Sequence, residues 1–172
     1  MNTTKQKQKR INENTNIGTG SSAAGKKGLK DVWISISNLQ HDGDEQENTM
    51  IFDTAGSYYF DEGIAVLRYQ ESELTGMDGT MTSVMVMPNQ VVVDRAGVLN
   101  GRMIFREGMR DSFPYETPYG QLTLGIDTRS IRRNINEHGG DVEIDYNTDL
   151  SHAFLAKNRF KISVKEMGKP NG

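Results

Sequence analysis

The sequence predicts an all-β fold, an antiparallel β-barrel of about eight strands preceded by a disordered N-terminal tail. Segments in which apolar and polar residues alternate recur along the chain from residue 31 onward. Turn signals separate them at about the eight-to-twelve-residue spacing of antiparallel β proteins. The first 29 residues contain no such alternation, so we divide the chain into a tail (1–29) and a barrel domain (30–172).

The tail is basic and polar. Residues 1–30 carry seven Lys or Arg side chains against one carboxylate, whereas the whole chain has a net charge of −3. Such a segment buries too little apolar surface to offset chain entropy, so we expect disorder, with contact to RNA or an anionic surface as an open alternative. Residues 20–26 fit the start of a phosphate-binding loop, but Lys27 replaces the magnesium-binding Ser or Thr and no strand precedes it. We interpret this stretch as a linker.

Composition excludes several classes of protein. No run approaches the roughly 18 apolar residues of a membrane span, and no apolar segment of a secretory signal follows the basic N-terminus. Cysteine is absent, which excludes disulfides and thiolate chemistry and makes a cytoplasmic location the expectation. The acidic balance of residues 31–172 argues against a barrel that binds nucleic acid.

Four segments alternate cleanly and predict strands with one buried and one wet face: 31–37, 122–126, 142–146 and 160–164. Four central segments are strand-like with more mixed polarity: 64–71, 80–87, 91–95 and 101–107. Met81, Met85 and Met87 share one face of their segment, and we expect them to fill the core. Residues 130–137 are the one candidate for a helical turn or two.

Strands joined by hairpins in this number remove their exposed edges by closing on themselves. At about eight strands, the interior of a barrel is either filled by side chains or holds one small ligand. The strand count leaves both alternatives open.

Seven segments of the predicted barrel carry a family resemblance: YYFDEG (58–63), LRYQESELTG (67–76), VVVDRAG (91–97), MIFREG (103–108), YETPYGQLTLGIDT (115–128), GDVEIDYNTD (140–149) and NRFKISVKE (158–166). They occur in order, span roughly residues 31–167, and resemble the YwiB-like family of small bacterial proteins of unknown function. The resemblance implies a calycin-like (lipocalin-like) β-barrel. It implies no chemistry, because that family has no established activity. Gln70 departs from the pattern, which has a second carboxylate there.

Strand phase predicts which polar side chains face the interior. Tyr69 and Glu71 share a face with Leu67, and Arg95 shares a face with Val93. Opposite charges at core-facing positions are costly unless paired, so we expect Glu71 and Arg95 to be buried partners. Such a network either fixes the barrel register or orients a ligand. The candidate ligand-binding residues are Tyr69, Glu71, Arg95, Tyr115, Thr117 and Tyr146.

No residue is assigned a catalytic or metal-binding role, and no cofactor is expected. His41, His138 and His152 are far apart in the sequence and lack the short spacing of metal ligands. No serine lies in a nucleophile elbow.

The leading hypothesis is non-catalytic binding of a small, mainly apolar ligand with a polar end, by architectural analogy. The alternatives are a protein-interaction or regulatory barrel with a filled core and, third, an enzyme that uses Glu71 and Arg95. Bulky inward side chains predict a partly filled barrel with a pocket at one end, rimmed by Tyr69, Arg95 and Tyr115. The sequence does not define the ligand, the partner or the oligomeric state.

Overall fold

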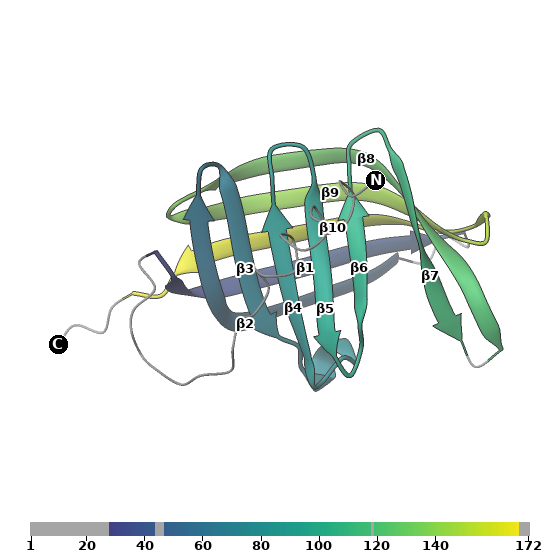
Figure 1. Ribbon diagram of the computed structural model, residues 1–172, viewed down its shortest axis with the longest axis horizontal. Helices are drawn as coiled ribbons and strands as arrows, with labels where there is room; N and C mark the ends of the chain where they lie inside the picture. Colours follow the sequence, from purple (N-terminus) through teal and green to yellow (C-terminus); the bar gives the residue numbers. More distant parts are fainter. Residues whose placement is uncertain (1–27, 44–46, 118, 169–172) are drawn as a thin grey trace, which may run out of the picture.

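The structure, a computed structural model, describes residues 28–43, 47–117 and 119–168, without the side chains of residues 115–117. Ten strands lie in these ranges and form one antiparallel sheet that curls into a nearly closed barrel (Figure 1). The predicted antiparallel barrel is confirmed, with ten strands in place of about eight. Residues 1–27, nearly all of the predicted tail, lie outside the described residues.

The strands, in chain order, are β1 (Lys30–Asp42), β2 (Glu47–Asp61), β3 (Ile64–Gln70), β4 (Thr80–Val86), β5 (Val91–Gly97), β6 (Gly101–Phe105), β7 (Arg110–Thr117), β8 (Gly120–Asn136), β9 (Gly139–Leu150) and β10 (Ala153–Glu166). A short 3-10 helix, η2 (Glu73–Thr75), follows β3. The sheet is an up-and-down meander with the order β6-β5-β4-β3-β2-β1-β10-β9-β8-β7. Consecutive strands therefore pair, β10 pairs with β1, and within the described residues no ladder joins β6 to β7.

Two walls of the barrel cross each other (Figure 1). The long strands β8, β9, β10 and β1 form the first wall, and the short strands β3 to β6 lie across it as the second. β2 belongs to both walls, because residues 47–58 pair with β1 and residues 56–61 pair with β3. At the change, a Cβ on Gly56 would lie 2.5 Å from the Arg68 carbonyl oxygen and from Ile34 Cδ1. Glycine thus permits the close approach at this corner.

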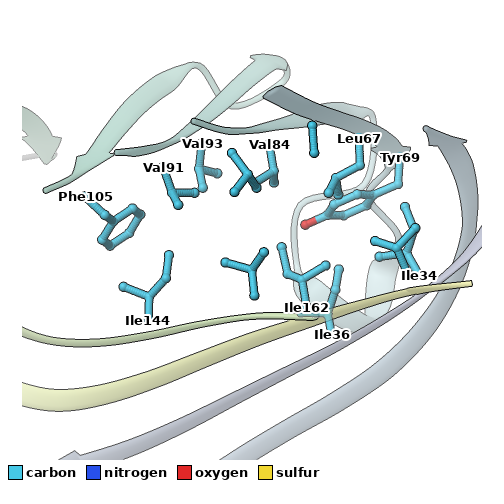
Figure 2. Packing of buried hydrophobic residues seen from close by; sticks show 14 of the residues in the cluster. Ile34, Ile36, Leu67, Tyr69, Val84, Val91, Val93, Phe105, Ile144 and Ile162 are labelled. Atoms are coloured by element: carbon cyan, nitrogen blue, oxygen red, sulfur yellow. The ribbon is translucent and has the colours of Figure 1, made fainter. Parts of the chain in front are cut away.

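The core lies between the two walls, where alternate side chains of facing strands meet (Figure 2). Val32, Ile34 and Ile36 of β1 are at most 2% exposed, as the alternation of the sequence predicts. They belong to one cluster with side chains of β3, β4, β5, β9 and β10. Burial of each such aliphatic side chain contributes about 1.5–3 kcal/mol, so this cluster is the main stabilising element of the barrel.

Two expectations about strands are wrong. Residues 130–137 form no helical turn, since residues up to 136 belong to β8. Ile131 and Ile135 are four residues apart, a spacing that fits one face of a helix as well as one face of a strand. In addition, β2 and β7 were not among the predicted strands, which accounts for the lower predicted count.

The expected role of the methionines is also wrong for two of the three. Met81 and Met85 are 42% and 36% exposed on the outer face of β4, whereas Thr80, Thr82, Val84 and Val86 point inward and are buried. Val84 and Val86 fit this phase by hydrophobicity, but Thr80 and Thr82 do not. The inward threonines are retained because their hydroxyls have partners: Thr80 accepts from the Leu99 amide at 3.1 Å, and Thr82 donates to Glu71.

A seam runs between the edge of β8 at residues 129–136, beyond its ladder with β7, and the ends of β2 and the short strands. Side chains bridge it in place of a ladder. The Glu107 carboxylate accepts from the Ile131 amide at 3.0 Å, and the Tyr58 hydroxyl donates to the Asn136 carbonyl at 2.6 Å. The Arg133 guanidinium donates to the carbonyl of Met87, in the turn between β4 and β5. The barrel is therefore closed by separate contacts along this line.

Candidate ligand-binding site

A partly open pocket of about 90 Å³ lies between the walls, beside the point where β3 ends. Most of its lining is apolar, from Ile36, Met50, Phe52, Met77, Val93, Met103, Phe105, Tyr146 and Phe160. Its polar lining consists of Asn38, Tyr69, Glu71, Thr75 and Arg95. The volume is below the roughly 300 Å³ at which ordinary small-molecule sites begin, so side chains fill most of the interior.

The register of the short strands places three polar side chains in one row. Tyr69 of β3 lies opposite Thr82 of β4, which in turn lies opposite Arg95 of β5. Residues directly opposite each other in a sheet share a face, and here that face is the interior. The strand-phase argument for Tyr69 and Arg95 therefore agrees with their position.

Glu71 follows β3 and is 3% exposed. Its backbone amide donates to the Thr80 carbonyl at 2.8 Å, which fixes its position after the strand. Two hydroxyls donate to its carboxylate, Thr82 at 2.5 Å and Thr75 at 2.8 Å. Thr75 is held in place by η2, which ends at Gly76 in a left-handed conformation (φ 70°). The sequence thus supplies a buried carboxylate whose two oxygens are both satisfied.

Arg95 differs from Glu71 in its partners. It lines the pocket, yet its Nε is buried without a hydrogen-bond partner among the described residues. The ion pairs between described side chains do not include it. Asn38, which faces the pocket from β1, likewise has a buried Oδ1 without a partner. Buried polar groups usually have a partner, so the pocket contains unused hydrogen-bonding capacity.

Two tyrosines of the pocket are kept neutral. Burial, followed by the neighbouring Glu71 carboxylate, raises the pKa of Tyr69, while Arg95 acts in the opposite direction. Burial raises the pKa of Tyr146 to about 12, again opposed by Arg95. Each ring also packs edge-on against a phenylalanine, Tyr69 against Phe52 and Tyr146 against Phe105. Both therefore present un-ionised hydroxyls on ordered rings at neutral pH.

Four of the six candidate residues, Tyr69, Glu71, Arg95 and Tyr146, line this one pocket. The side chains of the other two, Tyr115 and Thr117, lie outside the described residues. The expected ion pair between Glu71 and Arg95 is not formed within the described structure. The physical reason is that Thr75 and Thr82, which the sequence argument does not consider, already donate to the Glu71 carboxylate.

Sequence reasoning missed Asn38, Thr75 and Thr82. For Asn38 the signal was present, because it continues the inward series Val32, Ile34 and Ile36 by one more alternation. For Thr82 the signal was the phase of β4, which was assigned to the methionines. Thr75 lies in a 3-10 turn beyond the strand, where alternation has no meaning.

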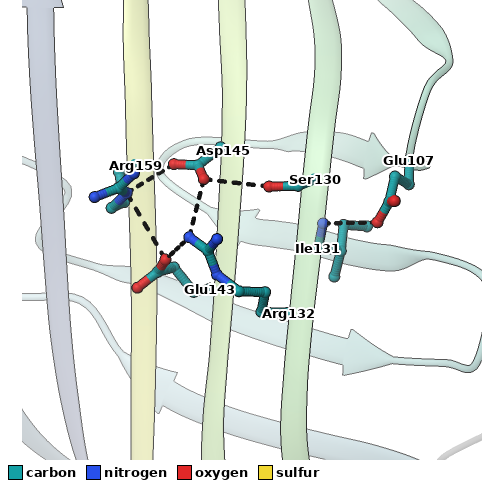
Figure 3. Close-up of polar contacts among 7 residues, drawn as sticks. All are labelled: Glu107, Ser130, Ile131, Arg132, Glu143, Asp145 and Arg159. Carbon is teal, nitrogen blue, oxygen red and sulfur yellow. Dashed lines mark hydrogen bonds and ion pairs between the residues drawn. The ribbon is translucent and has the colours of Figure 1, made fainter.

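A second hollow of about 430 Å³ lies on the outer face of the long wall and is lined by Leu39, His41, Arg129, Ser130, Asp145, Tyr146, Asn147, Lys157, Asn158 and Arg159. It is larger but more open than the pocket. Figure 3 shows that charges at this face already have partners: Asp145 accepts from Arg159 at 2.7 Å, from Arg132 at 3.1 Å and from Ser130 at 3.2 Å. We therefore take the inner pocket as the candidate site.

Glu71 is the carboxylate of the pocket, and it is enclosed by hydroxyl donors instead of facing an open cleft. Among the described residues, no group of three or more His, Asp or Glu is arranged to hold a metal ion. In the same part of the chain, no helix is long and apolar enough to cross a membrane.

Fold and pocket together define a small antiparallel β-barrel with a mostly filled interior. The family described as "Domain of unknown function (DUF1934)" matches residues 34–162, and the chain belongs to this family. It is similar to the uncharacterized β-barrel protein YwiB of Bacillus subtilis (strain 168), with 29% identity over 115 residues, covering 67% of this chain and 79% of YwiB. The crystal structure of the ywiB protein from Bacillus subtilis has the same fold. Its TM-score is 0.69 at 22% identity, and the match covers 81% of this chain and 94% of that one.

Proposed function

We propose that this protein binds, without catalysis, a small and mainly apolar ligand with a polar end, in the pocket beside the end of β3. The observation that supports it is an apolar pocket whose polar lining includes two groups, Arg95 Nε and Asn38 Oδ1, that are buried without hydrogen-bond partners among the described residues. A bound polar group satisfies such atoms and recovers the free energy lost by their desolvation. The calycin-like architecture implied by the family resemblance agrees with an internal site.

Three methionines make the small pocket adaptable. Met50, Met77 and Met103 line it, and Met50 is 38% exposed, which places it at the rim. Thioether side chains rearrange at low cost, so a ligand larger than the resting volume of about 90 Å³ is accommodated by their movement.

The test combines native mass spectrometry of protein from its own host with thermal denaturation against a panel of small apolar compounds. A ligand at a hundredfold its Kd adds about 2.7 kcal/mol and raises the Tm. Met50→Trp narrows the rim, and we expect it to abolish the shift. Met85→Trp is the matched control, because Met85 has a similar exposure (36%) on the outer face of β4. An equal shift in both variants, or no shift and no co-purified ligand in the native protein, contradicts the proposal.

A second candidate is a protein-interaction or regulatory barrel, favoured by large apolar side chains on the outer face. Trp33 of β1 is 54% exposed and Ile51 of β2 is 71% exposed. Trp33→Ala is expected to leave the core unchanged and to weaken binding to a partner that uses this face. Affinity capture with the wild-type protein and with Trp33→Ala, side by side, measures the difference. For either function we propose a cytoplasmic location, because the sequence contains no cysteine.

A further inference from the structure

We infer that the polar end of the ligand is an anion, of which a carboxylate is the simplest form, and that Arg95 is its counterion. This inference rests on the proposed function and specifies the class of ligand. It follows from the two charged side chains of the pocket, Glu71, whose carboxylate oxygens already accept hydrogen bonds, and Arg95, whose Nε donates to no described residue. Asn38 contributes to such a site only with its amide turned so that Nδ2, and not Oδ1, faces the anion.

The negative charge of the pocket is already occupied. Glu71 is 3% exposed, and its two carboxylate oxygens accept from Thr82 and Thr75. The Tyr69 hydroxyl lies beside the same carboxylate and beside Thr82. A ligand cation approaching Glu71 must displace at least one of these donors and leave a hydroxyl without a partner in the interior. The site is therefore poorly suited to an ammonium group.

The positive charge of the pocket is unoccupied. Five other arginines of the described chain form ion pairs with carboxylates: Arg102, Arg106, Arg110, Arg132 and Arg159. Arg95 forms none with a described side chain, although its Nε is buried and it faces a mostly apolar lining whose one carboxylate, Glu71, accepts from Thr75 and Thr82. A guanidinium has five N–H donors in a planar fork that matches a carboxylate, and its attraction for an anion is strengthened where water is excluded.

The neighbouring hydroxyls do not compete with a bound anion. Tyr69 and Tyr146 lie close enough to Arg95 for its charge to act on both, and both are un-ionised at neutral pH, because the ordinary tyrosine pKa of 10.0 is raised further by burial. They add no negative charge beside the guanidinium. A neutral phenol is also a hydrogen-bond donor, so the Tyr146 hydroxyl can share an anion with Arg95, whereas the Tyr69 hydroxyl lies beside Glu71.

Volume limits the ligand. A space of about 90 Å³ is smaller than the engineered cavity of roughly 150 Å³ that holds benzene. The resting pocket therefore accepts a short carboxylate, or the head of a longer one whose chain displaces Met50 at the rim. The apolar wall opposite, with Phe52 and Phe160, suits an aliphatic chain.

The experiment compares butanoate, hexanoate and octanoate with the alcohols and the primary amines of the same chain lengths, at neutral pH, by isothermal titration calorimetry and Tm shift. We expect the acids to bind most tightly and the ammonium ions least. Arg95→Met is expected to weaken the acids roughly 10- to 100-fold, as loss of a charged hydrogen bond does, and to leave the alcohols nearly unchanged. Arg68→Met is the matched control, because Arg68 is an exposed arginine that precedes the pocket residue Tyr69 on β3.

The outcomes separate the two proposals. If alcohols or amines bind as well as acids, or if Arg95→Met leaves the affinity for acids unchanged, the anionic inference is overturned and the binding function stands. If no compound of any class binds the wild-type protein, both are overturned. The order of affinities in the wild-type protein is informative by itself, so the result does not depend on the folding of Arg95→Met.

Discussion

The outer face of the long wall and the pocket on its inner side contain charged residues with different partners. Outside, Arg132 and Arg159 converge on Asp145 and Glu143, so that each cation has a carboxylate and each carboxylate has a cation (Figure 3). Inside, Glu71 is held by hydroxyls and Arg95 by no ion pair among the described side chains. Charges that staple neighbouring strands need partners within the protein. A charged side chain that lines a pocket and has no ion-pair partner keeps its hydrogen-bond donors available to a ligand.

The largest expected effect tests the phase of the strands, which decides what faces inward. Leu67→Ala removes a side chain with no exposed surface and is expected to cost about 2–5 kcal/mol in the free energy of unfolding. Met85→Ala, on the outer face of β4, is expected to cost less than about 1 kcal/mol. Urea denaturation of both variants measures the difference. Similar losses at the two positions would show that the inner and outer faces are wrongly assigned.

The second effect tests how the inner carboxylate is held. Glu71→Ala leaves the buried Thr82 hydroxyl without its acceptor and is expected to destabilise the protein by about 1–3 kcal/mol. Glu73→Ala, two residues further along in η2, changes an exposed carboxylate and is expected to stay within about 0.5 kcal/mol. The melting temperatures of the pair provide the measurement, and equal values contradict the hydroxyl cage around Glu71.

The third effect concerns pH and the outer charges. Burial raises the pKa of Asp145, but Arg159, Ser130 and Arg132 together outweigh it, so the pKa lies below its ordinary value of 3.8. A lowered folded-state pKa contributes stability above the unfolded value, and this stability is lost as the pH falls through the folded value. Asp145→Asn is thus expected to cost less than about 1 kcal/mol at neutral pH and to lose less stability than wild type on acidification below about pH 4. Parallel acid denaturation curves for the two proteins would contradict this.

The smallest effect is expected for Arg95→Met, and its sign carries the information. A direct buried ion pair with Glu71 would make this change cost about 3–5 kcal/mol. Because Glu71 has its own donors and Arg95 Nε has no partner, we expect no loss of stability beyond about 0.5 kcal/mol, or a slight gain. Chemical denaturation of the unliganded protein decides between the two values.

Much of the barrel could be predicted because alternation is a local signal. Val32, Ile34 and Ile36 were assigned inward from their period alone, and the same reasoning placed Tyr69, Glu71 and Arg95 toward one interior. The signal failed where a buried polar residue alternates with a more hydrophobic one. In β4, threonines take inward positions in place of a methionine because their hydroxyls have partners, and those partners, Glu71 and the Leu99 amide, lie in loops distant in sequence.

The partners of Glu71 could not be predicted for a related reason. Thr82 is eleven residues from Glu71 in sequence, and Thr75 reaches the carboxylate only through the geometry of a 3-10 turn. Pairing arguments based on charge alone select Arg95. They overlook neutral hydroxyl donors, which satisfy a carboxylate without the need to desolvate a second ion.

The two junctions between the long wall and the short wall are held in different ways. At the first junction, β2 pairs with β1 of the long wall and with β3 of the short wall, so the strand pairing is continuous. At the second junction, the seam, three separate hydrogen bonds hold the edge of β8: one from the Tyr58 hydroxyl, one to the Glu107 carboxylate and one from Arg133 to the backbone of the turn after β4. Within the described residues no ladder crosses the seam; where the chain itself crosses it, the backbone of Thr128 bonds to Gly108 and Met109. Separating the two walls along the seam thus costs single hydrogen bonds, whereas a fully laddered barrel must break strand pairing to widen.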